Sequence, residues 1–125
     1  MTIKGIDHLV LTVASLDSTC EFYERVLGMR REIFGSGRCA LKFGTQKINL
    51  HEAGKEFDPK ARHATPGSGD LCFIIDDVAA AQARLEAEGV EVIEGPAERT
   101  GAMGAMLSIY CRDPDGNLIE LSQYQ

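Results

Sequence analysis

The chain repeats one pattern of elements in its two halves, and this repeat limits the folds open to it more than any other feature. Residues 8–11 lead into an amphipathic segment closed by Gly28, and residues 70–73 lead into an alanine-rich segment closed by Gly89. The second apolar stretch begins 62 residues after the first, and the second closing glycine follows the first by 61 residues. Internal duplication is the simplest explanation of such a nearly constant offset.

Each half is predicted to run strand, helix, strand, strand and strand. Residues 18–21 have the form of a capping box and indicate the start of the first helix, while Asp77 is the expected cap of the second. Alternating apolar and polar residues indicate strands near residues 3–13, 29–34, 38–43, 46–51, 70–76, 90–95, 105–111 and 117–122. The predicted fold class is α+β, with module one at residues 1–53, a connector at 54–68 and module two at 69–125.

The last predicted strand carries a carboxylate on the face opposite the core. The pair Asp115 and Gly116 after a proline predicts a hairpin turn. Because side chains alternate along a strand, Ile119 and Leu121 share one face and Glu120 lies on the other. A carboxylate on an open sheet face is solvated, paired with a cation of the protein, or bound to a metal ion.

His8 is the counterpart of Glu120 on the first predicted strand. It shares a face with Val10 and Thr12, while Leu9 and Leu11 face the other way. A lone histidine in a strand is more often a hydrogen-bonded structural residue than a metal ligand. An imidazole and a carboxylate on the open faces of two related modules favour a functional site.

Composition excludes several classes of partner. The net charge of −6, with acidic and basic residues mixed along the chain, argues against nucleic acid and anionic membranes and favours a small-molecule substrate. No signal peptide is expected, because Asp7 and His8 interrupt the apolar run near the start. The four cysteines are widely spaced, which predicts buried free thiols and a cytoplasmic location.

Motifs spread over the whole chain resemble the vicinal oxygen chelate superfamily, which includes glyoxalase I, bleomycin-binding proteins and extradiol dioxygenases. They lie at residues 8–11, at residues 22–28 and in the turn at 113–117 that leads to Glu120. Stretches at residues 47–51, 66–68, 70–73 and 99–101 are similar to the branch named glyoxalase domain-containing protein five and its virulence-associated bacterial relatives. The resemblance implies a glyoxalase-like fold, in which two βαβββ modules form a cupped mixed sheet.

The resemblance also implies a divalent metal site on the inner sheet face. His8 and Glu120 match two of the four ligand positions directly. Asp70 stands where relatives usually have histidine, and Asn49 stands where glyoxalase I has glutamate. His51, two residues beyond Asn49 on the same strand face, is a further candidate ligand. The ion is left open among manganese, iron, nickel, zinc and magnesium, with oxygen-preferring ions favoured by Asp70.

Roles for the other residues follow from the same resemblance. In chemistry of the glyoxalase I type, a metal-bound carboxylate moves a proton between adjacent carbons, so Glu120 is the expected catalytic base. The expected substrate-binding residues are Asn49, Arg99 and Tyr110. Arg99 is expected to bind an anionic group of the substrate. The glycine-rich segment at 101–104, which follows Arg99, is expected to be mobile. The alternatives are an exposed arginine and a tyrosine that only packs.

Three functions are compatible with these residues. The first is a metal-dependent lyase or isomerase of the glyoxalase I type acting on a small oxygenated substrate. The second is a metal-free small-molecule binding or drug-sequestering protein of the bleomycin-resistance type, supported by Asn49 and Asp70 in place of stronger ligands. The third is an extradiol-type dioxygenase, which needs His51 as its second histidine. Small members of the superfamily complete each cup across a twofold dimer, so a homodimer is expected.

Overall fold

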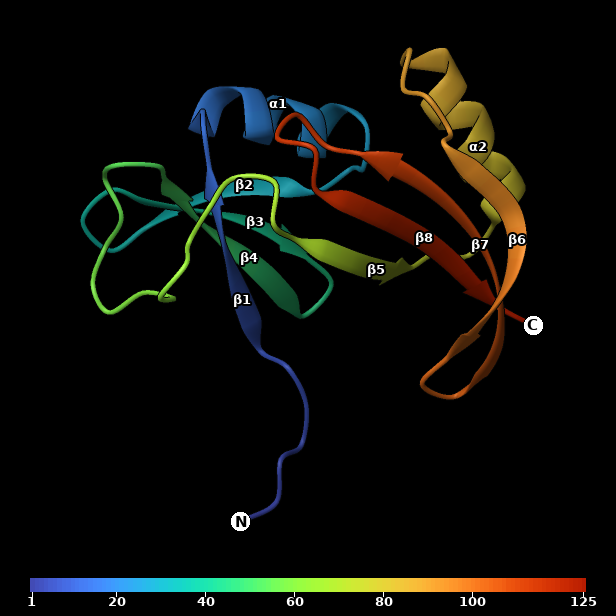
Figure 1. Cartoon of the computed structure of the whole chain (residues 1–125), viewed down its shortest axis with the longest axis horizontal. Coiled ribbons are helices and arrows are strands. Elements are labelled where there is room, and N and C mark those ends of the chain that lie inside the picture. The colour runs from blue at the N-terminus through green and yellow to red at the C-terminus, as the bar shows by residue number, and fades with distance from the viewer. The chain divides into compact units, whose positions relative to one another are not determined.

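The computed structural model describes all 125 residues and divides into two compact units, residues 1–67 and 68–125. Each unit is a four-stranded sheet with one helix (Figure 1). The first unit contains β1 (His8–Val13), α1 (Leu16–Arg25), β2 (Arg30–Phe34), β3 (Arg38–Phe43) and β4 (Gln46–Glu52). The second contains β5 (Asp70–Ile74), α2 (Val78–Ala87), β6 (Glu94–Gly101), β7 (Gly104–Arg112) and β8 (Leu118–Tyr124). The predicted α+β class and the repeated order of elements are confirmed.

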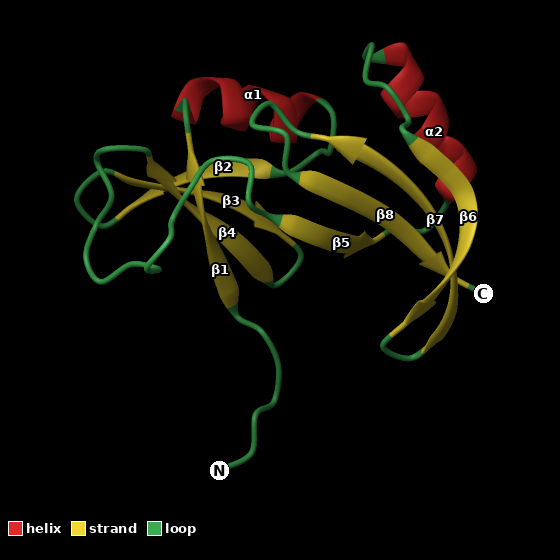
Figure 2. Ribbon diagram, viewed as in Figure 1, coloured by secondary structure: helices red, strands yellow, loops and turns green.

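The two sheets have the same topology, as the strands in Figure 2 show. Their strand orders are β1-β4-β3-β2 and β5-β8-β7-β6. In each sheet the first strand pairs in parallel with the last, and the other pairs are antiparallel. The last strand of each unit, β4 or β8, therefore lies between two other strands. Its open-face side chains have neighbours on both of those strands.

One face of each sheet is apolar and packs against the helix of the same unit. In the first unit Leu41 and Ile48 are fully buried, and the Cys20 thiol of α1 lies 3.6 Å from the Cys39 thiol of β3. In the second unit Ile109 and Ile119 are fully buried, and α2 contributes the buried residues Val78 and Leu85. The period-two alternation along β1 and β8 was therefore assigned to the correct faces.

The start of the first helix differs from the prediction. Ser15, not Ser18, is the N-cap, and its hydroxyl accepts a hydrogen bond from the Ser18 backbone N–H. The sequence contains two candidate serines, and only the extended backbone of Ser15 makes it the cap. Asp77 caps α2 as predicted, because its carboxylate accepts a hydrogen bond from the Ala80 backbone N–H at 3.1 Å.

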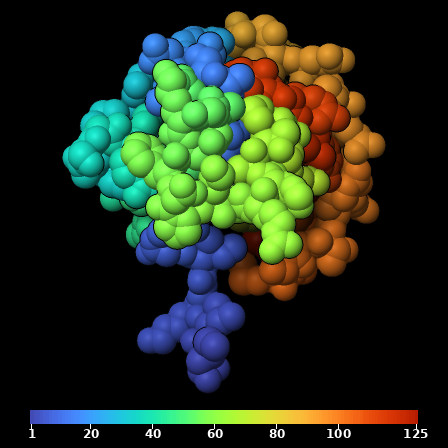
Figure 3. All heavy atoms as spheres, turned by 60° about the vertical axis from the view of Figure 1, so that its left-hand side comes forward, coloured from blue at the N-terminus to red at the C-terminus, as the bar shows by residue number.

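Two strand boundaries also differ from the prediction. β1 begins at His8 rather than near residue 3, because residues 1–7 have no strand partner; they project as a tail in Figure 3. The strand expected near 90–95 is β6, which runs from Glu94 to Gly101 and pairs with β7 as far as Gly104. The glycine-rich segment at 101–104 is thus the tight turn of a hairpin, and Arg99 lies within a strand.

The turn before β8 forms as predicted and fixes the start of that strand. The Asp113 carboxylate accepts hydrogen bonds from the backbone N–H groups of Asp115 and Asn117, and from the Asn117 side-chain amide. The side-chain Oδ1 of Asn117 in turn accepts from the Gly69 backbone N–H at 2.7 Å, next to the start of β5. These bonds set the registration of β8 and therefore the position of Glu120.

The cysteines are all free, and three of the four are buried. Cys72 is exposed, so the prediction of a buried thiol is wrong at this position, because Cys72 lies on the open face of β5. Neither helix is long and apolar enough to cross a membrane.

Candidate functional site

The open face of the second unit carries two rows of polar side chains across its strands. Strand pairing places Glu94, Tyr110, Glu120 and Cys72 in one row, from β6 through β7 and β8 to β5. The next row contains Arg112, Leu118 and Asp70. All of these side chains point away from α2, because residues of the same phase along a strand share a face.

An open cavity of about 510 Å³ lies over these two rows. Its lining residues are Asp70, Ile93, Glu94, Tyr110, Arg112, Leu118 and Glu120. Three of the seven are carboxylates and one is an arginine, so the cavity favours a cationic or metal-bound group over a free anion. Asp70, Glu120 and Tyr110, which were singled out from the sequence, are brought together here.

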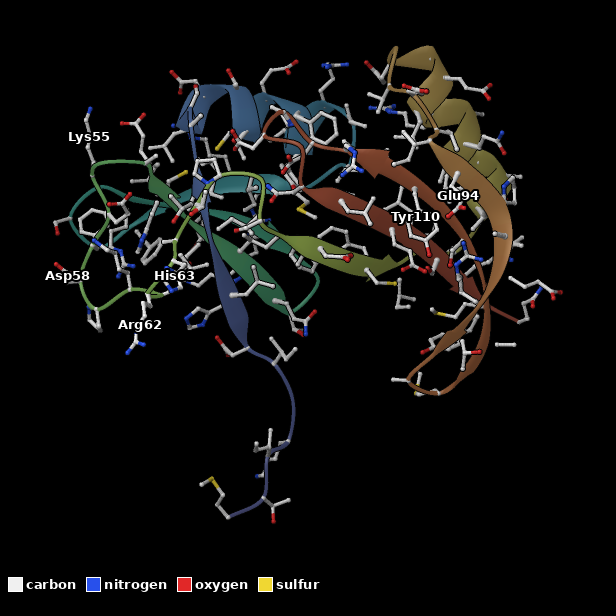
Figure 4. The ribbon with its side chains drawn as sticks, in the orientation of Figure 1. Lys55, Asp58, Arg62, His63, Glu94 and Tyr110 are labelled. Carbon is white, nitrogen blue, oxygen red and sulfur yellow. The ribbon has the colours of Figure 1, made fainter.

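A hydrogen-bond network connects Tyr110 to the cavity wall. The Arg99 Nε–H donates to the Tyr110 hydroxyl at 2.9 Å, and the Arg99 Nη2 donates to the Glu94 carboxylate at 2.8 Å. Figure 4 shows Glu94 and Tyr110 side by side on neighbouring strands. Burial raises the pKa of Tyr110, the nearby Glu120 carboxylate adds to that rise, and the Arg99 hydrogen bond opposes it. Tyr110 therefore keeps its proton at neutral pH, and since its oxygen accepts from Arg99, that proton is available to a neighbouring acceptor.

Glu120 is held in place by side chains on the same face. The Ser122 hydroxyl donates to the Glu120 Oε2 at 3.1 Å. Ser122 is itself 2.6 Å from the Ser108 hydroxyl and 3.2 Å from the Cys72 thiol. Because a hydroxyl has one proton, the Ser122 proton that goes to Glu120 leaves its oxygen to accept from the other two groups. The carboxylate is thus oriented by a chain of hydroxyls, and Glu120 lines the cavity.

His8 lies on the open face of the first unit, at the start of β1. Its Nδ1 is 2.8 Å from the Asp7 carboxylate, and its side chain is 45% exposed. A carboxylate on one ring nitrogen is the usual way to orient a metal-binding histidine through the other nitrogen. The Nε2 atom of His8 is therefore the one suited to a ligand.

His51 has an environment unlike that of a metal ligand. His51 is only 3% exposed, and Arg38 Nη2 donates to its Nε2 at 3.4 Å. Burial lowers the pKa of His51, and the Arg38 charge lowers it further. The phenyl ring of Phe57, from the connector, packs edge-on against the imidazole. A guanidinium at this distance repels a second cation, so Nε2 does not fit a metal ion.

Two buried polar atoms on β4 have no hydrogen-bond partner. They are Asn49 Oδ1 and His51 Nδ1, on residues that are 5% and 3% exposed. Strand pairing places Val10 and Ala40 on either side of Asn49, and neither side chain can bond to it. An unsatisfied buried polar atom costs about 1–3 kcal/mol.

The chemical types of the candidate ligands suit an oxygen-preferring divalent ion, but too few of them lie together to bind one. Asp70 and Glu120 line one cavity and offer carboxylates, and His8 offers an imidazole. No group of three or more His, Cys, Asp or Glu side chains that could hold a metal ion is present in the structure. Neither unit by itself completes a metal site.

Three site residues were missed by reasoning from the sequence. Glu94 and Arg112 line the cavity, and Arg38 contacts His51. Arg112 lies two residues after Tyr110 on β7 and therefore on the same face, so alternation alone could have predicted that it lies near the site. The predicted strand ended near Glu94, whereas β6 begins at Glu94. The sequence therefore did not show which face of the sheet the Glu94 side chain occupies. Arg38 lies opposite His51 in the register of the β3–β4 hairpin, so the two predicted strands at 38–43 and 46–51 contained the signal for this contact.

Comparison with known proteins identifies the family. The model of the Glyoxalase/Bleomycin resistance protein/Dioxygenase superfamily matches residues 5–121. The chain therefore belongs to this superfamily, and the resemblance stated from the sequence is confirmed. It is 58% identical to the glyoxalase domain-containing protein RDO1 of Mycosarcoma maydis over 126 residues, which cover 100% of this chain and 71% of that protein. It is 31% identical to a lactoylglutathione lyase of Pseudomonas aeruginosa, over 94% of this chain and 81% of that enzyme.

Solved structures agree on the fold. The crystal structure of virulence protein STM3117 from Salmonella typhimurium superposes with a TM-score of 0.99 at 54% identity and covers 100% of both chains. TnmS3, an antibiotic binding protein from Streptomyces, superposes with a TM-score of 0.80 at 25% identity, covering 100% of this chain and 99% of that chain. The glyoxalase-like fold is thus shown, in a superfamily that contains both an enzyme and a binding protein among these relatives.

Proposed function

We propose that the chain is a divalent-metal-dependent lyase or isomerase of the glyoxalase I type, acting on a small oxygenated substrate. Glu120 is the base that takes a proton from one carbon and returns it to the neighbouring carbon. Tyr110 and Arg99 position the substrate at the cavity, and Asn49 contributes a further contact. The observation that carries this proposal is the Glu120 carboxylate, oriented by Ser122 and lining an open cavity with Tyr110 and Asp70.

The arrangement supports proton transfer in two ways. One Glu120 oxygen accepts from Ser122 at 3.1 Å, which holds the carboxylate in one orientation and leaves the second oxygen to exchange a proton. The Tyr110 hydroxyl is fixed by Arg99, so it offers a directed donor to an oxygen that becomes negative during the reaction. The relationship to a lactoylglutathione lyase, at 31% identity, supports the same reaction class.

The metal would be held by His8, Asp70 and Glu120. A bound divalent ion supplies electrostatic stabilisation of the anion that forms at the reacting carbon. Because neither unit has three ligands of its own, the proposal requires ligands of both units to meet, and we infer that they do so in a homodimer located in the cytoplasm. Sedimentation of the purified protein tests the dimer, and metal content that survives dilution to monomers would contradict it.

The experiment that tests the enzyme proposal combines metal analysis with turnover. The purified protein is expected to contain about one divalent ion per site, and His8→Ala and Glu120→Ala should each lose it, since each removes a ligand. Glu91→Ala, an exposed loop carboxylate, is the control that should keep the metal. Hemithioacetal formed from methylglyoxal and glutathione is the first substrate to assay. Metal retained by both ligand variants, or no turnover at high protein concentration with metal added, would overturn the assignment.

A second candidate function is metal-free binding of a small molecule. It is favoured by the structural similarity to the antibiotic binding protein TnmS3. Under this alternative the cavity retains its ligand after chelator treatment, and Glu120→Ala changes affinity without changing metal content. The dioxygenase alternative gains no support, because Arg38 occupies the hydrogen-bonding position at the His51 Nε2.

A further inference from the structure

Arg38 of the first unit forms no ion pair with a carboxylate within 4.0 Å, although the Glu56 carboxylate of the connector acts on the neighbouring His51. Its guanidinium carbon lies 5.2 Å from the centre of the Phe34 ring and 5.0 Å from that of Phe57, and its Nη2 lies 3.4 Å from the His51 Nε2. Two aromatic rings make cation–π contacts with the guanidinium, and these contacts leave its N–H groups able to donate hydrogen bonds to a ligand. An arginine fixed in this way is prepared to bind a planar anion.

The surrounding sheet face adds further positive charge. Strand pairing places Arg30, Lys42 and Lys47 on the same open face as Arg38, against one carboxylate, Glu32. The Lys47 ammonium lies 3.8 Å from the centre of the Phe34 ring, on the aromatic side chain that also contacts Arg38. This face therefore attracts an anion, although the chain as a whole has a net charge of −6.

The two unpartnered buried atoms on β4, one of them on the histidine that Arg38 contacts, specify a second group on that anion. Because a guanidinium can only donate, the His51 Nε2 that it contacts must accept, and the neutral ring then carries its proton on Nδ1. His51 Nδ1–H is therefore an unpaired donor, and Asn49 Oδ1 is an unpaired acceptor two residues away on the same strand face. A hydroxyl group is the simplest group that accepts from one atom and donates to the other.

We propose that Arg38, His51 and Asn49 form a binding site for a small hydroxy acid, with the carboxylate on Arg38 and the hydroxyl between His51 Nδ1 and Asn49 Oδ1. The site is built from residues of the first unit alone, and it holds its ligand by hydrogen bonds and charge without a metal. It does not depend on the proton transfer assigned to Glu120. If the protein is a lyase, the site supplies the recognition of an anionic hydroxylated substrate.

Binding to the metal-free full-length protein tests this site. After dialysis against EDTA, lactate is titrated by calorimetry at about 0.15 M ionic strength, where long-range charge effects are screened. Propionate lacks the hydroxyl, 1,2-propanediol lacks the carboxylate, and inorganic phosphate tests whether any anion suffices. Lactate is expected to bind at least about fivefold more tightly than propionate, because one further hydrogen-bonded group is satisfied, and 1,2-propanediol should not bind measurably. Phosphate binding more tightly than lactate, or equal affinity for lactate and propionate, would overturn the assignment.

Variants locate the ligand on the protein. Arg38→Gln should weaken lactate binding by at least about tenfold, because a charge-assisted bond is lost. Asn49→Leu, which keeps the size of the side chain, should abolish the preference for lactate over propionate. Lys42→Gln is the matched control, since it removes a cation from the same face without touching His51, and it should change affinity by less than about twofold. Thermal melting confirms that each variant is folded, and Arg38→Lys provides a second test if Arg38→Gln is not, with the same direction of change expected.

The same titrations separate this site from the function proposed above. Glu120→Gln should bind lactate as well as the unmodified protein does, whether or not turnover is ever detected. If Glu120→Gln loses lactate binding while Arg38→Gln keeps it, the ligand lies in the second unit and the inference is wrong. Loss in Arg38→Gln with retention in Glu120→Gln supports it, even if the enzyme proposal fails.

Discussion

The open sheet faces of the two units have opposite character, although the units share one topology. In the first unit Arg30, Arg38, Lys42 and Lys47 lie on this face with one carboxylate, whereas in the second unit Asp70, Glu94 and Glu120 line a cavity with one arginine. The helix-covered faces remain alike, since both bury aliphatic side chains. After a duplication, the buried face is constrained by packing, and the open face is free to diverge. Under the two proposals made above, the difference corresponds to a division of labour, with chemistry in the second unit and anion recognition in the first.

The largest expected effect tests this division of labour directly. Glu120→Gln should lower kcat about 10²–10⁴-fold, because it removes the group that transfers the proton. Arg38→Gln should instead raise KM for an anionic substrate and leave kcat within about threefold, since it removes ground-state binding. Steady-state kinetics of both variants, with Glu91→Gln as control, provides the measurement. A fall in kcat for Arg38→Gln as large as that for Glu120→Gln would show that the two faces are not separate in role.

The similarity of the helix-covered faces predicts similar losses of stability. Leu41→Ala on β3 and Ile109→Ala on β7 remove fully buried side chains at corresponding strands of the two sheets. Each is expected to lower the free energy of unfolding by about 2–5 kcal/mol. Ile33→Ala, at a residue that is 59% exposed, is the control and should stay within about 0.5 kcal/mol. Urea denaturation monitored by circular dichroism measures all three, and a loss below about 1 kcal/mol at either buried site would show that the two faces are packed differently.

Tyr110→Phe is expected to lower turnover about tenfold. The change removes one directed hydroxyl donor at the cavity, and one such hydrogen bond contributes about 1–1.5 kcal/mol. Tyr124→Phe is a matched control, because its hydroxyl accepts a hydrogen bond from the Met103 backbone N–H but does not line the cavity. Unchanged kcat/KM in Tyr110→Phe would leave this tyrosine with a packing role alone.

The smallest expected effect concerns acid and the first unit. Burial, with the Arg38 charge, lowers the pKa of His51 below the value of about 6.5 of an unfolded histidine. The unfolded chain therefore binds more protons than the folded chain between these two values, so the free energy of unfolding falls as pH drops below about 6.5. His51→Phe, which keeps an aromatic ring against Phe57, should remove this part of the pH dependence. Urea denaturation at pH values from about 7.5 down to about 5.5 measures it, and an unchanged slope in the variant would assign the dependence to another group.

Much of the fold was predictable from local patterns in the sequence. Period-two alternation assigned Ile119 and Glu120 to opposite faces of β8, and Asp77 and the turn at 113–117 were recognised from their capping and turn chemistry. Where two candidates of equal chemistry compete, local reasoning failed. Ser15 and Ser18 are both good caps, and only the observed backbone conformation selects Ser15. The start of β6 was misplaced because the pairing of β6 with β7, rather than its own composition, determines where that strand begins.

The sequence by itself determined the repeated α+β architecture and the phase of His8, Asn49, Asp70, Tyr110 and Glu120 along their strands, because alternation and turn chemistry act between near neighbours. Only the tertiary structure decided which of these side chains share a cavity and which are left unpaired. Arg38 on β3 contacts His51 on the adjacent strand β4, and Glu94 on β6 lies beside Tyr110 on β7. Such contacts depend on the registration between neighbouring strands and on side-chain length, which alternation along a single strand does not determine.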